Sequence, residues 1–296
     1  MKKFGIMTRL AVAGLTILFL TACPNRATQT VDTSAEDPRV QAIWEKFEAQ
    51  VAAYADTVDT DAMEQAETFQ TTMTSSMEVE GVPSETVIVS AVDIPNRRIV
   101  AETETSGEYE SSFKVLYNDG EIYFSSVFDG ELETYKLDGP EKAEMVAIYN
   151  QMFTWLDTMS DPEAVAALTE ENMDAGRYDG YQVYGDVLEG EQITLDLSNN
   201  PILEGSPMPE FGLTSMVFTP EGLIAGQVTE IEGEQFLMVY DQPTAFVSGF
   251  TDMSYTMYQF DGEEITWAGD FQLSLTLNPA LGESLFEPPT VTDSID

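Results

Sequence analysis

The sequence predicts an α+β fold that is mainly β: a curved antiparallel sheet, forming an incomplete barrel, with an N-terminal helix and a helical insert packed on its concave face. Two segments, near 38–58 and 140–159, repeat apolar residues with the period of a helix. The segments 66–138 and 178–277 instead alternate with period two, and turn residues recur about every ten positions. No change of composition separates the halves, so residues 37–296 are expected to form a single domain.

The first expected element is a helix over residues 38–58. Asp37 supplies an N-cap, and Pro38 suits the first helical position. The apolar stripe is large and aromatic, so this helix needs a surface to pack on. The stripe consists of Val40, Ile43, Trp44, Phe47, Val51, Tyr54 and Val58.

Residues 66–138 are expected to form an antiparallel meander of five or six strands. The clearest alternation is at 111–117, where Phe113, Val115 and Tyr117 share one face. Turn signals stand at 81–83, 95–96, 118–120 and 129–130. The segments 87–89 and 122–124 are apolar on both faces, which predicts that the sheet is covered on both sides in places.

A helical insert should follow, opened by Pro140 and closed by Asp161-Pro162. Its stripe is Met145, Ile148, Tyr149, Met152, Phe153, Leu156 and Met159, widened by Val146 and Trp155. A second short helix, with Val165, Leu168 and Met173 apolar, is expected to end near Gly176.

Strands are then expected to resume at 178–187, 192–197, 214–219, 223–231, 235–240, 253–260 and 264–277. The last of these alternates strictly, with four apolar residues on one face and four polar residues on the other. Glycines are expected to mark the turns, at Gly180, Gly190, Gly222, Gly233 and Gly262.

Residues 1–22 have the pattern of a secretory signal peptide, with a basic start, an apolar run at 10–20 and small Ala22 at the cut. Leu20-Thr21-Ala22-Cys23 fits a lipobox, so this start resembles a bacterial lipoprotein precursor. The resemblance implies that residues 1–22 are removed and that Cys23 is lipidated. Residues 23–36 would then be the lipidated cysteine and a flexible tether, because they are polar and lack an apolar period. The alternative is an ordinary signal peptide, or an uncleaved apolar anchor, with an accidental cysteine.

The apolar run at 10–20 is about half the length needed to span a bilayer, and no later run is long enough. The expected localisation is therefore extracytoplasmic, with the acyl groups on Cys23 as the attachment to the cell membrane or the outer membrane. Cys23 is the only cysteine, so no internal disulfide is expected.

The composition is strongly acidic, with 53 Asp and Glu against 12 Lys and Arg and a net charge of −41. Such a surface repels nucleic acid and anionic headgroups, so no nucleic-acid partner is expected. It also suggests a salt-rich milieu, in which screening makes the self-repulsion tolerable. The hydrophobic content of 43% is enough for a sizeable core.

Catalytic chemistry is not predicted. Histidine is absent, which excludes Ser-His-Asp and Cys-His catalysis, and neither a metal site nor a cofactor is expected. The sequence contains no phosphate-binding glycine loop and no nucleophile elbow. The acidic run at 56–61 lacks the glycine and the later glutamate of an EF-hand loop, so a solvated helix end is favoured over a calcium site.

The lipobox, the aromatic helix, the meander, the helical insert and the second run of strands together resemble the LolA/LolB-like and LppX/LprG-like superfamily of lipoprotein and lipid carriers. The resemblance covers about residues 38–290 by order of elements and includes no diagnostic motif beyond the lipobox. It implies an incomplete barrel, plugged by helices, over a hydrophobic cavity that holds acyl chains. The expected ligand is therefore a lipid or a lipoprotein acyl group.

Fourteen methionines, several of them beside aromatic residues, are typical both of core packing and of an adaptable apolar cavity. The residues expected to line such a cavity are Phe113, Val115, Tyr117, Tyr149, Met152, Phe153, Leu273 and Leu275. Arg97 and Arg98, a close basic pair, are expected at its rim, where they would meet an anionic headgroup. Two alternatives stay open: a scaffold or sensor for an envelope protein, similar to RseB-type regulators of the same fold, and, as the third choice, a carboxylate-dependent hydrolase.

Overall fold

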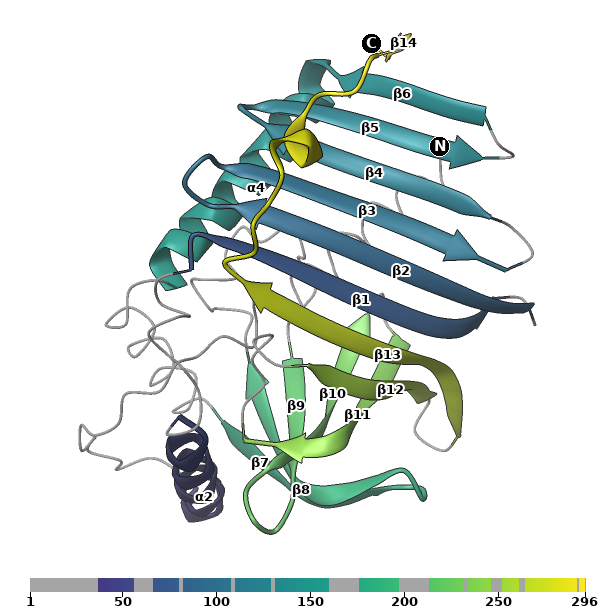
Figure 1. The fold of residues 1–296 in the computed structure, drawn as a ribbon. Helices are drawn as coiled ribbons and strands as arrows, with labels where there is room; N and C mark the ends of the chain where they lie inside the picture. The colour runs from purple at the N-terminus through teal and green to yellow at the C-terminus, as the bar shows by residue number, and fades with distance from the viewer. Residues whose placement is uncertain are drawn as a thin grey trace.

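The computed structural model describes residues 37–55, 66–79, 82–107, 110–128, 131–159, 176–196, 213–231, 234–245, 252–260, 264–291 and 293–295. The expected signal peptide, Cys23 and the tether lie outside these residues. The second short helix expected before Gly176 and the acidic run at 56–61 lie outside them as well. The described chain is mainly β with two α-helices, as the sequence predicts (Figure 1).

The first half of the chain forms a helix, a six-stranded meander and a second helix. Helix α2 comes first and α4 last, and each of the six strands between them pairs with the next. Their bounds are α2 (Pro38–Ala55), β1 (Thr68–Val79), β2 (Val82–Asp93), β3 (Arg98–Ser106), β4 (Ser111–Asn118), β5 (Glu121–Phe128), β6 (Glu131–Leu137) and α4 (Gly139–Met159).

The second half is another meander, of seven strands, followed by a short C-terminal segment. The strands are β7 (Arg177–Tyr184), β8 (Leu188–Asp196), β9 (Leu213–Phe218), β10 (Ile224–Ile231), β11 (Glu234–Thr244), β12 (Met253–Phe260) and β13 (Ile265–Leu277). The C-terminal segment contains the 3₁₀ helix η1 (Glu283–Phe286) and the short strand β14 (Asp293–Ile295).

The two meanders join into one sheet because the last long strand, β13, pairs with the first, β1. The described strands form a 14-stranded sheet in the order β14-β6-β5-β4-β3-β2-β1-β13-β12-β11-β10-β9-β8-β7. β14 and β7 stand at its two edges, so the sheet is open and not closed into a barrel. All pairings are antiparallel except that of β14 with β6, which is parallel.

The helices begin where local chemistry favours them. Asp37 Oδ1 accepts a hydrogen bond of 2.9 Å from the backbone N–H of Arg39, which satisfies one of the unpaired donors at the start of α2. Lys142 in the first turn of α4 donates to Glu121 at the start of β5, at 2.6 Å. This ion pair holds the start of α4 against the β5 end of the sheet.

Both helices pack on the same face of the sheet, which we call the concave face. α4 lies behind β2–β6 in Figure 1, and α2 lies beside β7 and β8 at the other end. The helical insert and the N-terminal helix therefore occupy the positions that the sequence predicts.

The opposite, convex face is covered in part by the C-terminal segment. Phe286 of η1 is fully buried against Ala91, Val100 and Leu116 of β2, β3 and β4. Figure 1 shows this segment crossing in front of these strands. A third cluster, built around Leu237 and Val217, lies on the convex side of the second meander. Of the doubly apolar segments noted in the sequence, Ile88, Ile122 and Phe124 are buried on the concave side. On the convex side Tyr123 packs partly buried against the Phe286 cluster, whereas Val87 and Val89 are only half-buried.

Two of the expected turn glycines have other roles. Gly180 lies within β7 at an irregularity of the pairing with β8, and Gly190 lies inside β8. A Cβ at Gly190 would stand 2.3 Å from the backbone oxygen of Phe218, so this glycine permits a close approach of strands. The turn between β7 and β8 is at 185–187 instead. Gly233 and Gly262 lie outside the described residues.

Candidate functional site: the concave face of the sheet

A single row of side chains crosses the middle of the concave face. The cross-strand partners, from β4 to β12, are Phe113, Thr103, Ile88, Met73, Leu273 and Met253. We call these six residues the central row. Six adjacent strands at about 4.8 Å spacing give it a length of about 24 Å. Five of the six side chains are apolar, so the row is a mainly hydrophobic path from one meander to the other, interrupted only by Thr103 between Phe113 and Ile88.

The α4 end of this path is an aromatic cluster. The ring centroids of Tyr149 and Phe153 lie 4.8 and 6.1 Å, respectively, from the ring centroid of Tyr117. Phe153 is completely buried, and burial raises the pKa of Tyr149. The Tyr117 hydroxyl donates to Asn150 Oδ1 at 3.1 Å. The cluster holds α4 on β4 and β5 and excludes water from them.

The residues predicted to line a cavity are brought together on this face. Seven of them belong to the α4 cluster or pack against it, and Leu273 belongs to the neighbouring cluster at the α2 side. The seven are Phe113, Val115, Tyr117, Tyr149, Met152, Phe153 and Leu275. That they contact a ligand stays a prediction.

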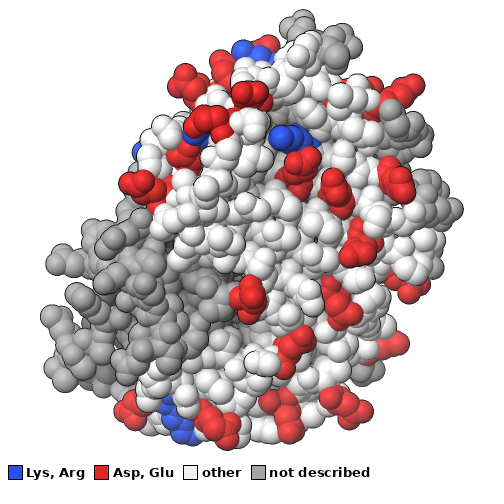
Figure 2. All heavy atoms as spheres, viewed as in Figure 1, with Lys and Arg blue, Asp and Glu red and all other residues white. Residues whose placement is uncertain are grey.

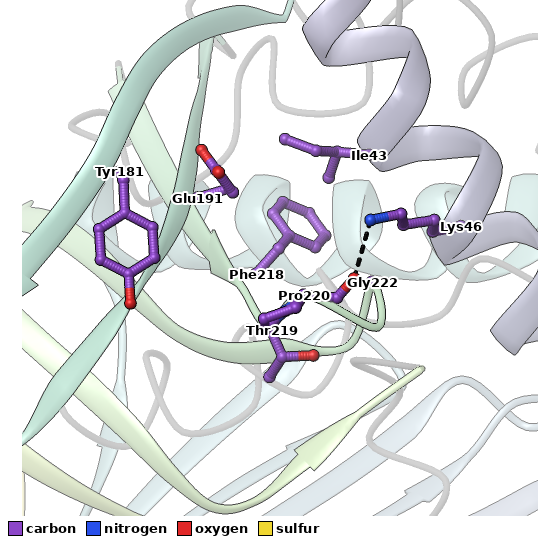
Figure 3. A pocket seen from close by; sticks show the side chains of 8 residues that line it. All are labelled: Ile43, Lys46, Tyr181, Glu191, Phe218, Thr219, Pro220 and Gly222. Atoms are coloured by element: carbon purple, nitrogen blue, oxygen red, sulfur yellow. Dashed lines mark hydrogen bonds between the residues drawn. The ribbon is translucent and has the colours of Figure 1, made fainter.

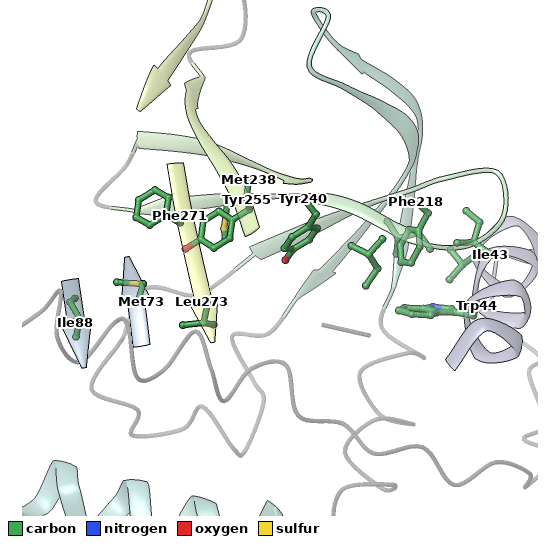
Figure 4. Packing of buried hydrophobic residues seen from close by; sticks show 13 residues of the cluster. Ile43, Trp44, Met73, Ile88, Phe218, Met238, Tyr240, Tyr255, Phe271 and Leu273 are labelled. Carbon is green, nitrogen blue, oxygen red and sulfur yellow. The ribbon is translucent and has the colours of Figure 1, made fainter. Parts of the chain in front are cut away.

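The α2 end has its own cluster, which the sequence did not single out as a site. Val40, Ile43 and Trp44 of α2 are buried in the same cluster as Phe218 of β9 and Met73 of β1. The ring of Phe218 meets those of Trp44 and Phe47 edge to face, at 5.6 and 5.8 Å between centroids. Figure 4 shows this group at one end of a line of side chains that continues through Tyr240 and Tyr255 to Phe271. The aromatic stripe of α2 predicted the helix and its buried face. Local periodicity could not identify the strands on which that face packs.

A small pocket of about 130 Å³ opens beside α2. Figure 3 shows it between α2 and the second meander, and Lys46 donates to the carbonyl of Pro220 across it, at 2.8 Å. Its lining residues are Ile43, Lys46, Tyr181, Glu191, Phe218, Thr219, Pro220 and Gly222. Ligand pockets usually measure about 300–1,000 Å³, so this one is too small for an acyl chain. This pocket is therefore not a candidate site for an acyl chain.

Arg97 and Arg98, expected together at a rim, point to opposite faces. Arg98 lies on the convex side, where its guanidinium pairs with Asp93 and Glu283 and stacks on the ring of Phe286 at 4.4 Å. Arg97, in the turn before β3, lies on the concave side, 5.7 Å from the ring centroid of Phe153. Only Arg97 is therefore placed near the predicted lining residues, and its contact with a headgroup stays a prediction.

Carboxylates far outnumber basic groups in this protein, 53 against 12. Figure 2 shows acidic side chains at many places on the described part of the visible face and basic ones at a few places only. Several basic side chains are engaged by carboxylates, as in the pairs of Arg39 with Asp37 and of Lys136 with Glu121. The hydrogen bond from Arg39 lowers the pKa of Asp37 to about 2. The described surface thus offers little positive charge for an anionic partner.

The described residues contain no group of three or more histidine, cysteine, aspartate or glutamate side chains that could hold a metal ion. Within the same residues, no helix is long and apolar enough to cross a membrane.

No protein-family model matches the chain, and no curated protein matches it. Among solved structures, the chain is similar to a DUF1329 family protein from Desulfovibrio piger, at 10% identity over 85% of this chain and 98% of that one, with a TM-score of 0.35. It is also similar to a Vibrio parahaemolyticus domain named for outer membrane lipoprotein sorting, at 9% identity over 77% and 93%, with a TM-score of 0.31.

A third similar structure is the lipoprotein LppX of Mycobacterium tuberculosis, at 10% identity over 83% of this chain and 99% of that one, with a TM-score of 0.25. The function is inferred below from the residues of this chain.

Proposed function

We propose that this protein binds a lipid, or the acyl chain of a lipoprotein, along the central row of its concave face, as a carrier or sequestering protein and not as an enzyme. The single observation that carries the proposal is the row itself, about 24 Å of mainly apolar side chains that joins the two clusters on which the helices pack. One leaflet of a bilayer has a hydrocarbon thickness of about 15 Å, half of the ~30 Å core, so an extended acyl chain fits this length.

The residue types on this face suit an acyl chain. Met73 and Met253 stand beside Leu273 in the row. Met257, also on β12, pairs with Met238 of the next strand, β11. Methionine side chains adapt to ligands of irregular shape because they are unbranched and flexible. Burying a sixteen-carbon chain contributes on the order of 12 kcal/mol, at about 0.8 kcal/mol per CH₂.

The proposal places the protein outside the cytoplasm, attached to a membrane through acyl groups on Cys23. Because like charges repel, the acidic surface would keep the attached domain away from anionic headgroups. Radiolabelled palmitate incorporated into the wild-type chain, and absent from a Cys23→Ser variant, is the expected result. Equal labelling of both chains would contradict attachment at this residue.

Native mass spectrometry of the Cys23→Ser chain purified from a bacterium tests the lipid site itself. We expect a population that carries one lipid. Met253→Gln should lower the occupancy about tenfold, because an amide on the apolar row loses its water without a partner. Ser254→Gln is the matched control, since residue 254 neighbours 253 but faces the convex side. A chain that carries no lipid and takes up no added monopalmitoylglycerol would contradict the proposal.

A second candidate function, docking of an envelope protein, is favoured by one observation at the edge of the sheet. In the described part of the chain, β7 pairs with a strand on one side only, whereas β6 is capped by β14. Tyr181 and Val183 on β7 are 53% and 61% exposed, which is high for apolar side chains on an edge strand. Stoichiometric capture of an envelope protein by the wild-type chain, lost in a Val183→Lys variant, would support this alternative.

A further inference from the structure

The indole Nε1 of Trp44 is buried without a hydrogen-bond partner. Among the described residues only one other buried side-chain atom, Thr229 Oγ1, shares this state. Trp44 is 8% exposed, and its Nε1 is out of contact with bulk solvent. An indole N–H can only donate, and unpaired buried donors are both rare and destabilising. Phenylalanine would supply the ring without this cost, so the N–H indicates an acceptor that arrives with a ligand.

The surroundings of Trp44 define what carries the acceptor. The indole packs edge to face against Phe47 and Phe218, with centroids 5.5 and 5.6 Å away. It belongs to the cluster that contains Met73 and Leu273 of the central row. Figure 4 shows the same group of side chains continuing from Trp44 toward Tyr240 and Tyr255. A molecule that reaches Trp44 along this face must therefore be mainly apolar.

The charges near Trp44 favour a neutral acceptor over an anion. α2 has two basic residues, and both are engaged: Arg39 binds Asp37, and Lys46 Nζ donates to the Pro220 carbonyl. The chain as a whole carries a net charge of −41. A carboxylate or phosphate buried beside Trp44 would have to draw the Lys46 ammonium away from the Pro220 carbonyl to be compensated by this helix, which makes its burial costly. An ester carbonyl accepts the same hydrogen bond without that cost.

We propose that Trp44 Nε1 donates a hydrogen bond to the ester carbonyl of an acyl lipid bound on the concave face. This inference rests on the proposed lipid-binding function and adds its ligand class: neutral acyl esters are preferred to free fatty acids and to hydrocarbon chains without a carbonyl. The ester can belong to a membrane glycerolipid or to an acylated lipoprotein, and the chemistry that Trp44 recognises is the same in both.

Two ligands that differ only in the carbonyl test this bond: monopalmitoylglycerol, which is an ester, and 1-O-hexadecylglycerol, which is the matching ether. We expect the wild-type chain to bind the ester about tenfold more tightly, which corresponds to about 1.4 kcal/mol. Trp44→Phe should abolish this preference while it retains binding of the ether. Trp267→Phe is the matched control, because Trp267 is 44% exposed and on the convex side.

The indole N–H resonance of Trp44, assigned by its loss in Trp44→Phe, should shift downfield with the ester and not with the ether. Equal affinity of the wild-type chain for ester and ether, or an equal loss of both in Trp44→Phe, would overturn the hydrogen bond while leaving lipid binding in place. Failure of the wild-type chain to bind either ligand would overturn the lipid function as well. Dipalmitoylglycerol and a dipalmitoyl lipopeptide are then tested as competitors of bound monopalmitoylglycerol, and competition by either one supports recognition of an ester. Stronger competition by dipalmitoylglycerol indicates a membrane glycerolipid as the source, and stronger competition by the lipopeptide indicates an acylated lipoprotein.

Discussion

Single residues decide which part of the chain covers each face of the sheet. Arg98 begins β3 on the convex side, and its side chain joins Asp93 of β2 to Glu283 and Phe286 of the C-terminal segment. Asp93 and Arg98 are almost buried, with side chains 7% and 13% exposed. Desolvation alone would raise the pKa of Asp93, but hydrogen bonds from Arg98 and Asn96 outweigh it and hold that pKa below its usual range.

Asp93→Asn should lower the free energy of unfolding by roughly 1–3 kcal/mol at neutral pH, because it leaves the Arg98 guanidinium with one carboxylate fewer. A carboxyl whose pKa is lower in the folded state stabilises the fold above its unfolded pKa, and the gain is lost as pH falls. The difference between wild type and variant should thus be constant above about pH 5 and shrink below about pH 4. Urea titrations at several pH values measure it. A difference that does not change down to pH 3 would contradict the pairing.

At the scale of elements, α2 is held to the second meander by the turn between β9 and β10. Lys46 and Gln50 of the helix donate to the carbonyls of Pro220 and Glu221, at 2.8 and 3.2 Å. Gly222 follows in the left-handed region with φ of +88°, and a Cβ there would stand 2.9 Å from backbone atoms of α2. The close approach of turn and helix therefore depends on this glycine.

Gly222→Ala should displace α2 and destabilise the protein by about 1–3 kcal/mol more than Gly120→Ala does. Gly120 is the matched control because it also has a positive φ, of +74°, but nothing lies within 4 Å of an added Cβ. Both variants bear the backbone strain of about 1–2 kcal/mol, and only Gly222→Ala adds the collision with the helix. Thermal unfolding of the two variants beside wild type measures the difference. Equal losses would show that α2 does not pack tightly on this turn.

The elements themselves could be predicted from the sequence, but their long-range partners could not. The stripes predicted α2 and α4, and the period-two segments predicted the β1–β6 meander and the strands of the second one. The pairing of Met73 with Leu273 joins residues 200 positions apart, and no local pattern encodes it. The convex cover by Phe286 was missed because a single turn of 3₁₀ helix has no measurable period. Arg97 and Arg98 separate because Arg97 ends the turn in the left-handed region, with φ of 49°, whereas Arg98 is the first residue of β3.

At the scale of the whole molecule, charge sets the conditions under which the sheet is stable. A net charge of −41 is spread over a surface on which the basic groups are few (Figure 2). The Debye length falls from about 30 Å at 0.01 M salt to about 3 Å at 1 M, so salt removes most of the repulsion between distant carboxylates. The fold, which brings the carboxylates closer together than the unfolded chain does, gains more from this screening.

The melting temperature should therefore rise by on the order of 5 °C between 0.01 M and 1 M NaCl, since about 2–4 °C corresponds to 1 kcal/mol for a chain of this size class. A Glu85→Lys/Glu104→Lys variant should show a smaller rise, because both residues are exposed on the convex side and the change brings the net charge closer to zero. Differential scanning calorimetry of both chains over the same salt series gives the two slopes. If repulsion limits the stability, the variant must also have a higher melting temperature than wild type at 0.01 M NaCl and lose that advantage at 1 M NaCl. A difference in melting temperature that stays constant over the salt series would mean that local packing, and not the charge, separates the two chains.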